Sequence, residues 1–167
     1  MSDTPSGTPE PEPVRVRITR LDPSHDEDAA AILAACTAEG TIERGREILD
    51  GARGDSACEI YGLFEGEELA AVYVLKKVSF ANEIAYLAVR EDRRRRGHGR
   101  ACLHDALFRS GRRPITVEAD DRTVGFYKAC GFKLVGKRTG PGGATRYRLG
   151  WHAPRPRPVT GTGESGE

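Results

Sequence analysis

A loop rich in glycine and arginine, between residues 90 and 100, holds the residue types best suited to chemistry. The apolar run 83–89 leads into Arg94-Arg95-Arg96-Gly97-His98-Gly99-Arg100, and a helical pattern follows. Glycine lets the backbone approach a ligand closely, and the free N–H groups of a first helical turn favour an anion. The arrangement predicts a pyrophosphate-binding loop, with a solvated basic turn as the alternative. No Gly-Lys-Ser/Thr follows, and the three-glycine dinucleotide fingerprint is absent from the sequence.

The elements that must position this loop show both strand and helix patterns. Apolar alternation or continuous apolar runs predict strands at 14–21, 59–64, 69–78, 83–89, 115–119, 132–135 and 145–149. Apolar periodicity with capping and stop signals predicts helices at 24–38, 41–51, 99–109 and 122–130. Ser24 with Glu27 fits a capping box for the first helix. The strand at 83–89 is nearly all apolar, so we expect it to be central and buried on both faces. This order predicts an α/β layered domain around a mixed sheet.

The composition of the 167 residues points to one domain with two tails. Seven of the ten prolines fall in the first 13 and last 16 residues, among Gly, Ser, Thr and Glu. Such segments bury too little apolar surface to become ordered. We therefore expect disordered tails at 1–13 and 152–167 around a folded domain at 14–151.

Charge, hydropathy and cysteine spacing argue against several classes of protein. A net charge of +1 is no signature of polyanion binding. No apolar run approaches the roughly 18 to 20 residues that span a bilayer, and the first residues lack the regions of a signal peptide. We expect a cytoplasmic protein without a membrane partner. The cysteines lack C-x-x-C and zinc-finger spacing, so we expect reduced thiols and no metal; they are Cys36, Cys58, Cys102 and Cys130.

Two sequence motifs lie within the predicted order of strands and helices, which covers residues 14–150. The first is Arg94-Arg95-Arg96-Gly97-His98-Gly99, and the second is Phe126-Tyr127 followed by Gly131-Phe132. Together they resemble the GNAT superfamily of acetyl-CoA-dependent N-acetyltransferases, whose motifs are Arg/Gln-x-x-Gly-x-Gly/Ala and F-Y-x-x-x-G-F. The chain departs from the family pattern at two positions. Asp120 stands where many members have an asparagine that touches the cofactor, and Glu91 replaces a frequent proline.

The resemblance implies a mixed, mostly antiparallel sheet, flanked by helices, whose central strands splay apart to admit acetyl-CoA. Backbone groups of Leu87 and Val89 would pair with pantetheine, and one of their N–H groups would stabilise an oxyanion. Loop N–H groups would hold the pyrophosphate, with arginine side chains free for the remaining phosphate. For His98 we expect a side chain that points outward. The implied cofactor-binding residues are Leu87, Ala88, Val89, Arg94, Arg95, Arg96, Gly97, His98, Gly99, Arg100 and Asp120.

Acetyl transfer to an amine requires two proton transfers, and the resemblance implies residues for both. A lysine-like amine, with a pKa of ~10.4, must lose a proton before it can attack. Glu83 resembles the glutamate that serves as base in protein-acetylating members, with Glu118 and an ordered water as alternatives. Tyr127 matches the general acid that protonates the leaving thiolate. No histidine at readable spacing activates Cys130, so direct transfer in a ternary complex is preferred to a covalent acyl-enzyme.

The resulting hypothesis is an N-acetyltransferase that moves acetyl from acetyl-CoA to a primary amine of a small molecule, peptide or protein. The alternatives are a catalytically silent acyl-CoA-binding regulatory module and a tRNA-aminoacyl acetylating toxin. The near-neutral charge and the lack of interleaved aromatic residues argue against a nucleic-acid partner. The sequence leaves open the acceptor, the range of acyl groups and the choice between monomer and homodimer.

Overall fold

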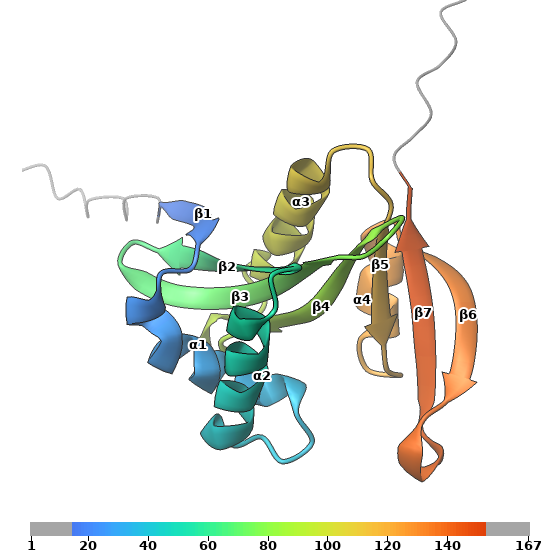
Figure 1. Cartoon of the computed structure of the whole chain (residues 1–167), viewed down its shortest axis with the longest axis horizontal. Coiled ribbons are helices and arrows are strands. Elements are labelled where there is room, and N and C mark those ends of the chain that lie inside the picture. The colour runs from blue at the N-terminus through green and yellow to red at the C-terminus, as the bar shows by residue number, and fades with distance from the viewer. Residues whose placement is uncertain (1–14, 153–167) are drawn as a thin grey trace, which may run out of the picture.

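A seven-stranded sheet forms the centre of the computed structural model, which describes residues 15–152 (Figure 1). The strands are β1 (Val16–Arg20), β2 (Cys58–Glu65), β3 (Glu68–Lys77), β4 (Asn82–Val89), β5 (Ile115–Ala119), β6 (Lys133–Thr139) and β7 (Thr145–Trp151). Their order in the sheet is β1-β2-β3-β4-β5-β7-β6. All neighbours are antiparallel except the parallel pair β4 and β5. Apart from His152, the predicted tails lie outside the described residues.

The two central strands separate part of the way along their length. Residues Asn82–Ile84 of β4 pair with Ile115–Val117 of β5. The pairing ends there, although β4 continues to Val89 and β5 to Ala119. The strand predicted at 83–89 is therefore central, and the central strands splay apart. The expectation that it is buried on both faces is wrong, because Tyr86 is 36% exposed and Leu87 is only half-buried. Where the strands separate, both residues line a cleft.

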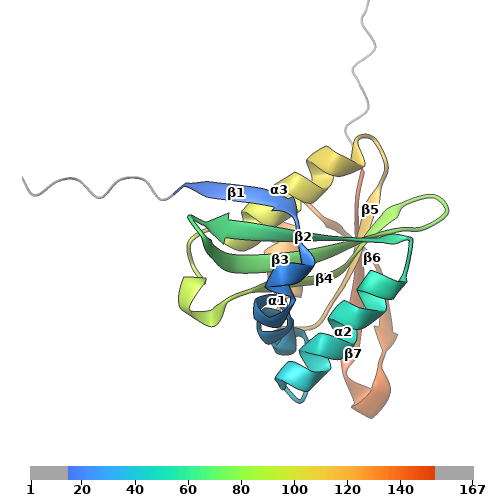
Figure 2. The ribbon, with the colours of Figure 1, turned by 60° about the vertical axis from the view of Figure 1, so that its left-hand side comes forward.

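Helices cover both faces of the sheet, which confirms the layered α/β architecture (Figures 1 and 2). α1 (Asp26–Leu33) and α2 (Ile42–Gly54) pack over one apolar core, which contains Leu33, Leu49, Val72 and Val74. α3 (His98–Ser110) and α4 (Val124–Ala129) pack over a second core, which contains Tyr73, Leu75, Leu103 and Ile115. Burial of these apolar side chains holds the helices against the sheet. No helix within residues 15–152 has the length and apolar character needed to cross a bilayer.

The first helix begins differently from the prediction. Ser24 does not cap it: Asp22 Oδ1 accepts a hydrogen bond from Ser24 N at 2.9 Å, and a 3₁₀ turn occupies Pro23–His25 before α1. Proline at a first helical position explains the early turn, because its φ is already helical and its missing N–H is not needed there. Glu27 instead pairs with Arg46 of α2 at 2.7 Å.

The second helix begins next to the predicted residue, Thr41, which caps it, and it is longer than predicted. Thr41 Oγ1 accepts a hydrogen bond from Arg44 N at 3.4 Å. α2 continues beyond Gly51 to Gly54, and Arg53 in its last turn pairs with Asp26 at 2.7 Å. Gly45 allows the helices to cross closely, since a Cβ there would lie 1.9 Å from the carbonyl oxygen of Ala30. The strand predicted at 115–119 is found with the same ends as β5. The other remaining predicted elements are found with shifted ends, and the last hairpin is longer than predicted.

Candidate functional site

A cleft of about 1460 Å³ opens where β4 and β5 separate. Glu83 stands at the start of β4 and the arginine-glycine loop follows its end, so these two features mark opposite ends of the cleft. Every residue implied as cofactor-binding lines this cleft except Arg96, and so do Tyr127, Glu83 and Glu118. The fold therefore brings together residues that lie far apart in the sequence.

The loop before α3 has the backbone form of an anion-binding turn. Arg95 and Gly97 both have left-handed conformations, with φ of 65° and 81°. No described side chain caps α3, so the N–H groups of its first turn are available to a ligand. A Cβ at Gly97 would meet open space, whereas a Cβ at Gly99 would lie 3.1 Å from Phe126 Cζ. The two glycines thus serve backbone conformation and close packing respectively.

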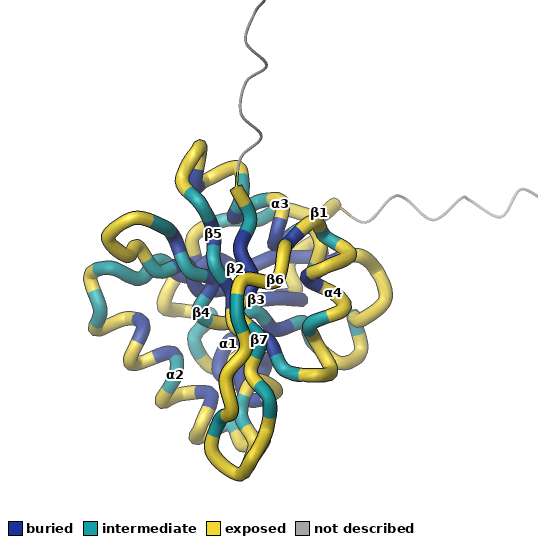
Figure 3. Tube along the Cα trace, turned by 90° about the vertical axis from the view of Figure 1, so that its right-hand side faces the viewer, coloured by how far each residue is buried: buried dark blue, intermediate teal, exposed yellow. Residues whose placement is uncertain are grey.

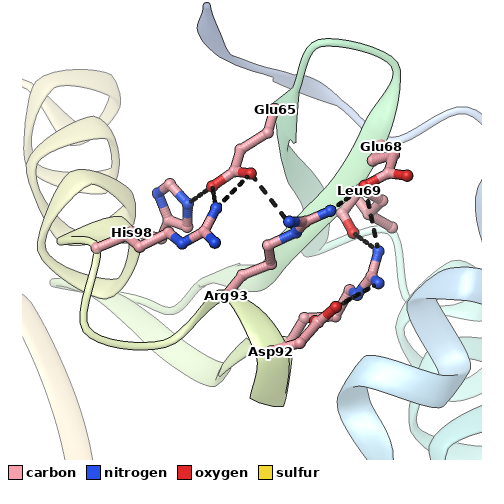
Figure 4. A network of polar contacts seen from close by, with 8 residues as sticks. Glu65, Glu68, Leu69, Asp92, Arg93 and His98 are labelled. Carbon is pink, nitrogen blue, oxygen red and sulfur yellow. Dashed lines mark hydrogen bonds and ion pairs between the residues drawn. The ribbon is translucent and has the colours of Figure 1, made fainter. Parts of the chain in front are cut away.

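A buried carboxylate, Glu65 at the end of β2, ties this loop to the sheet (Figure 4). Arg96 Nη1 donates to Glu65 Oε2 at 3.1 Å, and Arg93 Nε lies 3.5 Å from the same oxygen. His98 Nε2 contacts Glu65 Oε1, and Arg93 also pairs with Glu68. The hydrogen bond from His98 holds the pKa of Glu65 below its ordinary value against the opposing effect of burial, and Arg96 lowers that pKa further.

This network corrects two expectations. The His98 side chain is buried at 6% exposure and does not point outward. Arg96 Nη1 is paired with Glu65 and is not free as expected, whereas Arg95 and Arg100 form no ion pair with a described residue. A contact between Arg96 and a phosphate stays a prediction. The sequence carried no local sign of this arrangement, because Glu65 lies more than thirty residues before Arg96 and reads only as part of a hairpin turn.

Tyr127 lies on α4 with its ring held between two phenylalanines. Its centroid is 5.2 Å from that of Phe126 and 5.7 Å from that of Phe132, both edge-on. Its hydroxyl makes no hydrogen bond to any residue in the described range. Burial, with smaller effects of nearby Cys36, Cys130 and Asp120, raises the pKa of this phenol well above its ordinary value. The phenol therefore remains protonated at neutral pH and can act as a proton donor.

Cys36 lines the cleft near Tyr127, and it had no predicted catalytic role. Its thiol donates to the carbonyl oxygen of Leu87 at 3.6 Å, across 51 positions of sequence. Desolvation raises the pKa of this thiol, although the Leu87 contact opposes the shift. A thiol that stays protonated is a poor nucleophile.

Two carboxylates at the other end of the cleft differ in their pairing. Glu83 lies level with Thr116, just before the strands diverge, and forms no ion pair with a described residue. Glu118 pairs with Arg138 of β6 at 2.9 Å. An unpaired carboxylate is the better placed of the two to accept a proton, so the geometry favours Glu83 over Glu118.

Asp120 shapes the start of α4 at the cleft wall. Its Oδ1 accepts hydrogen bonds from Arg122 N at 2.9 Å and from Thr123 N at 3.0 Å. Burial would raise the pKa of Asp120, but the hydrogen bonds from Thr123 and Arg122 outweigh it and hold the pKa below its ordinary value. A direct contact between Asp120 and a cofactor stays a prediction. No group of three or more potential metal ligands is found among residues 15–152.

Comparison with known proteins gives one family and many structures of the same fold. A family model described as an acetyltransferase (GNAT) domain matches residues 56–134. An aminoglycoside 6'-N-acetyltransferase complexed with coenzyme A has a TM-score of 0.73 at 14% identity, over 84% of this chain and 99% of that one. A GNAT family acetyltransferase from Elizabethkingia anophelis with acetyl-CoA bound has a TM-score of 0.62 at 18% identity, over 83% and 98%.

A third similar structure is the ribosomal-protein-S18-alanine N-acetyltransferase from Escherichia coli. Its TM-score is 0.64 at 18% identity, over 83% of this chain and 94% of that chain. At these identities the structures establish a shared fold. No curated protein matches the chain.

Proposed function

Because the chain belongs to the GNAT superfamily, we propose that it is an N-acetyltransferase that moves acetyl from acetyl-CoA to a primary amine by direct transfer in a ternary complex. One observation carries the proposal. The cleft between β4 and β5 joins an anion-binding loop at Gly97 to an unpaired carboxylate at Glu83, with a buried phenol at Tyr127 on its wall. We further propose a cytoplasmic location, in keeping with four unpaired cysteines among the described residues.

The loop suits the diphosphate of coenzyme A. The backbone at Gly97 faces open space and the first turn of α3 has free N–H groups. Arg95 and Arg100, both at the cleft, can pair with phosphate oxygens without first giving up a carboxylate. The unpaired edge of β4 from Ala85 to Val89 offers backbone groups to the pantetheine arm.

Acetyl-CoA supplies the acetyl group as a thioester. Glu83 accepts a proton from the acceptor ammonium, and the freed nitrogen forms a bond to the acetyl carbon. N–H groups of Leu87 or Val89 donate to the oxygen that gains negative charge. Tyr127 gives its proton to the departing sulfur as the C–S bond breaks, and it regains a proton when the new amide nitrogen loses one. The raised pKa of the Cys36 thiol makes it a poor nucleophile, which favours direct transfer over an acyl group on Cys36.

The basic loop gives little support to a nucleic-acid partner. Arg93 and Arg96 are paired with Glu65, and Arg93 also with Glu68. These pairs remove two of the loop arginines from the charge available to a phosphodiester chain.

Thermal melting and CoA release together test the proposed function. Acetyl-CoA should raise the melting temperature, whereas NAD and ATP at equal concentration should not. Release of CoA should then depend on an amine from a panel of small amines, aminoglycosides, polyamines and peptides. Stabilisation without turnover on every amine would support the silent binding module, and no stabilisation would contradict the proposal.

We expect the double replacement Gly97→Val, Gly99→Val to weaken acetyl-CoA binding by roughly tenfold or more. Valine at Gly97 cannot easily keep φ near 81°, and valine at Gly99 must displace the Phe126 ring. Calorimetric titration of the folded variant checks this. Gly136→Val, on exposed β6 with open space at its Cβ, is the control, and unchanged affinity in the double variant would contradict the assigned cofactor loop.

We expect Glu65→Gln to raise KM for acetyl-CoA by roughly threefold to tenfold while kcat changes less. Glutamine removes the charge that holds Arg96 and His98, so the loop loses its preorganised form. Glu68→Gln is the matched control, because Glu68 is an exposed partner of Arg93 in the same turn and such pairs contribute little. Equal KM values for Glu65→Gln and the wild type would show that the loop does not depend on this carboxylate.

A further inference from the structure

The β6–β7 hairpin carries a hollow of about 360 Å³ lined mostly by cations. Its lining residues are Glu118, Gly136, Lys137, Arg138, Arg146 and Arg148. Glu118 and Arg146 also line the main cleft, so the hollow continues that cleft beyond β5. Figure 3 shows the hairpin exposed along most of its length. The cations therefore face solvent beside the cleft.

The hollow lies on the same sheet face as Glu83. Ile84 packs in the core under α3 and α4, so its neighbour Glu83 lies on the opposite face, the one covered by α1 and α2. Glu83 is level with Thr116 on β5, Glu118 follows two residues later, and Glu118 is opposite Arg148 on β7. α1 and α2 cover this face over β2, β3 and β4, and Figure 1 shows them away from β6. The face is thus open from the cleft to the hairpin.

The positive charges of the hollow are only partly compensated. Arg138 lies directly opposite Arg146 across the β6–β7 pair, where like charges repel. Glu118 offsets Arg138 at 2.9 Å. Neither Arg146 nor Arg148 forms an ion pair with any residue between 15 and 152. Two unpaired guanidiniums side by side are a site that a carboxylate would complete.

We propose that Arg146 and Arg148 select the acceptor by binding an acidic side chain of a peptide whose amine is presented to Glu83. This inference rests on the proposed function. Glu83 is level with Thr116 and so with Gly150 on β7, and Arg148 and Arg146 lie two and four residues further along that strand. With neighbouring strands about 4.8 Å apart and a rise of about 3.3 Å per residue, the two arginines lie roughly 12 and 16 Å from Glu83, backbone to backbone. An extended peptide advances about 3.3 Å per residue, which puts the acidic side chain about four to five residues from the acceptor amine. The carboxylate of a free amino acid lies too close to its own amine to reach both positions.

The carboxylates around the cleft favour a peptide over a polyanion. Glu47, Asp55 and Glu83 line the same cleft as Arg146. These carboxylates would repel a continuous phosphodiester backbone, whereas a peptide with an ammonium group and separate carboxylates meets an opposite charge at each place.

Matched peptides test the inference. One peptide has a free N-terminal amine with Asp or Glu at its fifth and sixth positions, and its counterpart has Asn or Gln there. We expect kcat/KM, measured by CoA release, to be roughly tenfold or more higher for the acidic peptide. In the double variant Arg146→Gln, Arg148→Gln this preference should fall towards one. Arg112→Gln removes an exposed arginine before β5 and should keep the full preference.

The outcomes separate the inference from the proposed function. Equal kcat/KM for both peptides, or a preference that survives the double variant, would overturn the inference and leave N-acetylation standing. If no amine is acetylated, the proposed function fails, and calorimetric binding of the two peptides to the CoA-saturated protein decides the inference by the same comparison. Tighter binding of a single-stranded RNA oligonucleotide than of the acidic peptide would also overturn it.

Discussion

Tyr127→Phe should retain acetyl-CoA affinity while kcat falls by roughly 10- to 10⁴-fold. The ring would keep its edge-on contacts with Phe126 and Phe132, and the hydroxyl makes no hydrogen bond whose loss would disturb the described fold. A general acid acts only as the thiolate departs, so its removal lowers turnover without weakening the ground-state complex. Calorimetry with acetyl-CoA and steady-state kinetics on a competent amine measure the two quantities.

Tyr147→Phe is the matched control for this change. Tyr147 lies on β7, and its hydroxyl donates a hydrogen bond to Asp121 at 2.6 Å. The substitution therefore removes the same atom from a tyrosine that does not line the cleft. We expect near-normal kcat in this variant. Full turnover by Tyr127→Phe on its best acceptor would mean that water protonates the thiolate.

The raised pKa of Tyr127 gives the pH dependence of the acid a definite sign. The phenol is active in its protonated form, and burial extends that form to higher pH than in an ordinary tyrosine. The wild-type kcat should therefore show no falling limb from this group up to pH ~10, the ordinary tyrosine value. A kcat profile that falls below pH 9 in the wild type and not in Tyr127→Phe would contradict the assignment.

Features written into local sequence were predictable. The glycine loop before α3 and the helix itself follow from glycine spacing and apolar periodicity within a dozen residues. Thr41 likewise marks the start of α2, which its side chain caps. The predicted start of α1 was wrong because two local signals competed. Pro23 and the Asp22 carboxylate favour a 3₁₀ turn at the position where Ser24 would otherwise cap the helix.

Features that depend on distant partners were not predictable. Glu65 meets Arg96 and His98 only because β2 and the loop before α3 come together in space. Glu83 and Arg148 share a face only through the register of three strands. A sequence gives each strand its alternation but not its neighbour or its register, so charge pairing in the site emerges only with the sheet.

Glu83→Gln should lower kcat/KM near pH 7 by roughly 10²- to 10⁴-fold, with acetyl-CoA affinity unchanged. Glutamine keeps the shape of the side chain but cannot accept the ammonium proton. At pH values below its pKa of ~10.4, an amine gains about tenfold in neutral fraction for each unit by which the pH is raised. The variant should therefore recover activity steeply between pH 7 and 9, while the wild type changes less. The pH profile of kcat/KM for both proteins measures this.

Glu118→Gln provides the comparison that identifies the base. Glu118 is held by Arg138 at 2.9 Å, so its carboxylate is already compensated and its loss should cost much less rate than the loss of Glu83. Glu118→Gln also leaves Arg138 without its partner, which should alter acceptor KM more than kcat because this pair lies beside the hollow on β6–β7. A larger loss of kcat in Glu118→Gln, with alkaline recovery, would assign the base to Glu118. Small losses in both variants would instead leave deprotonation to an ordered water.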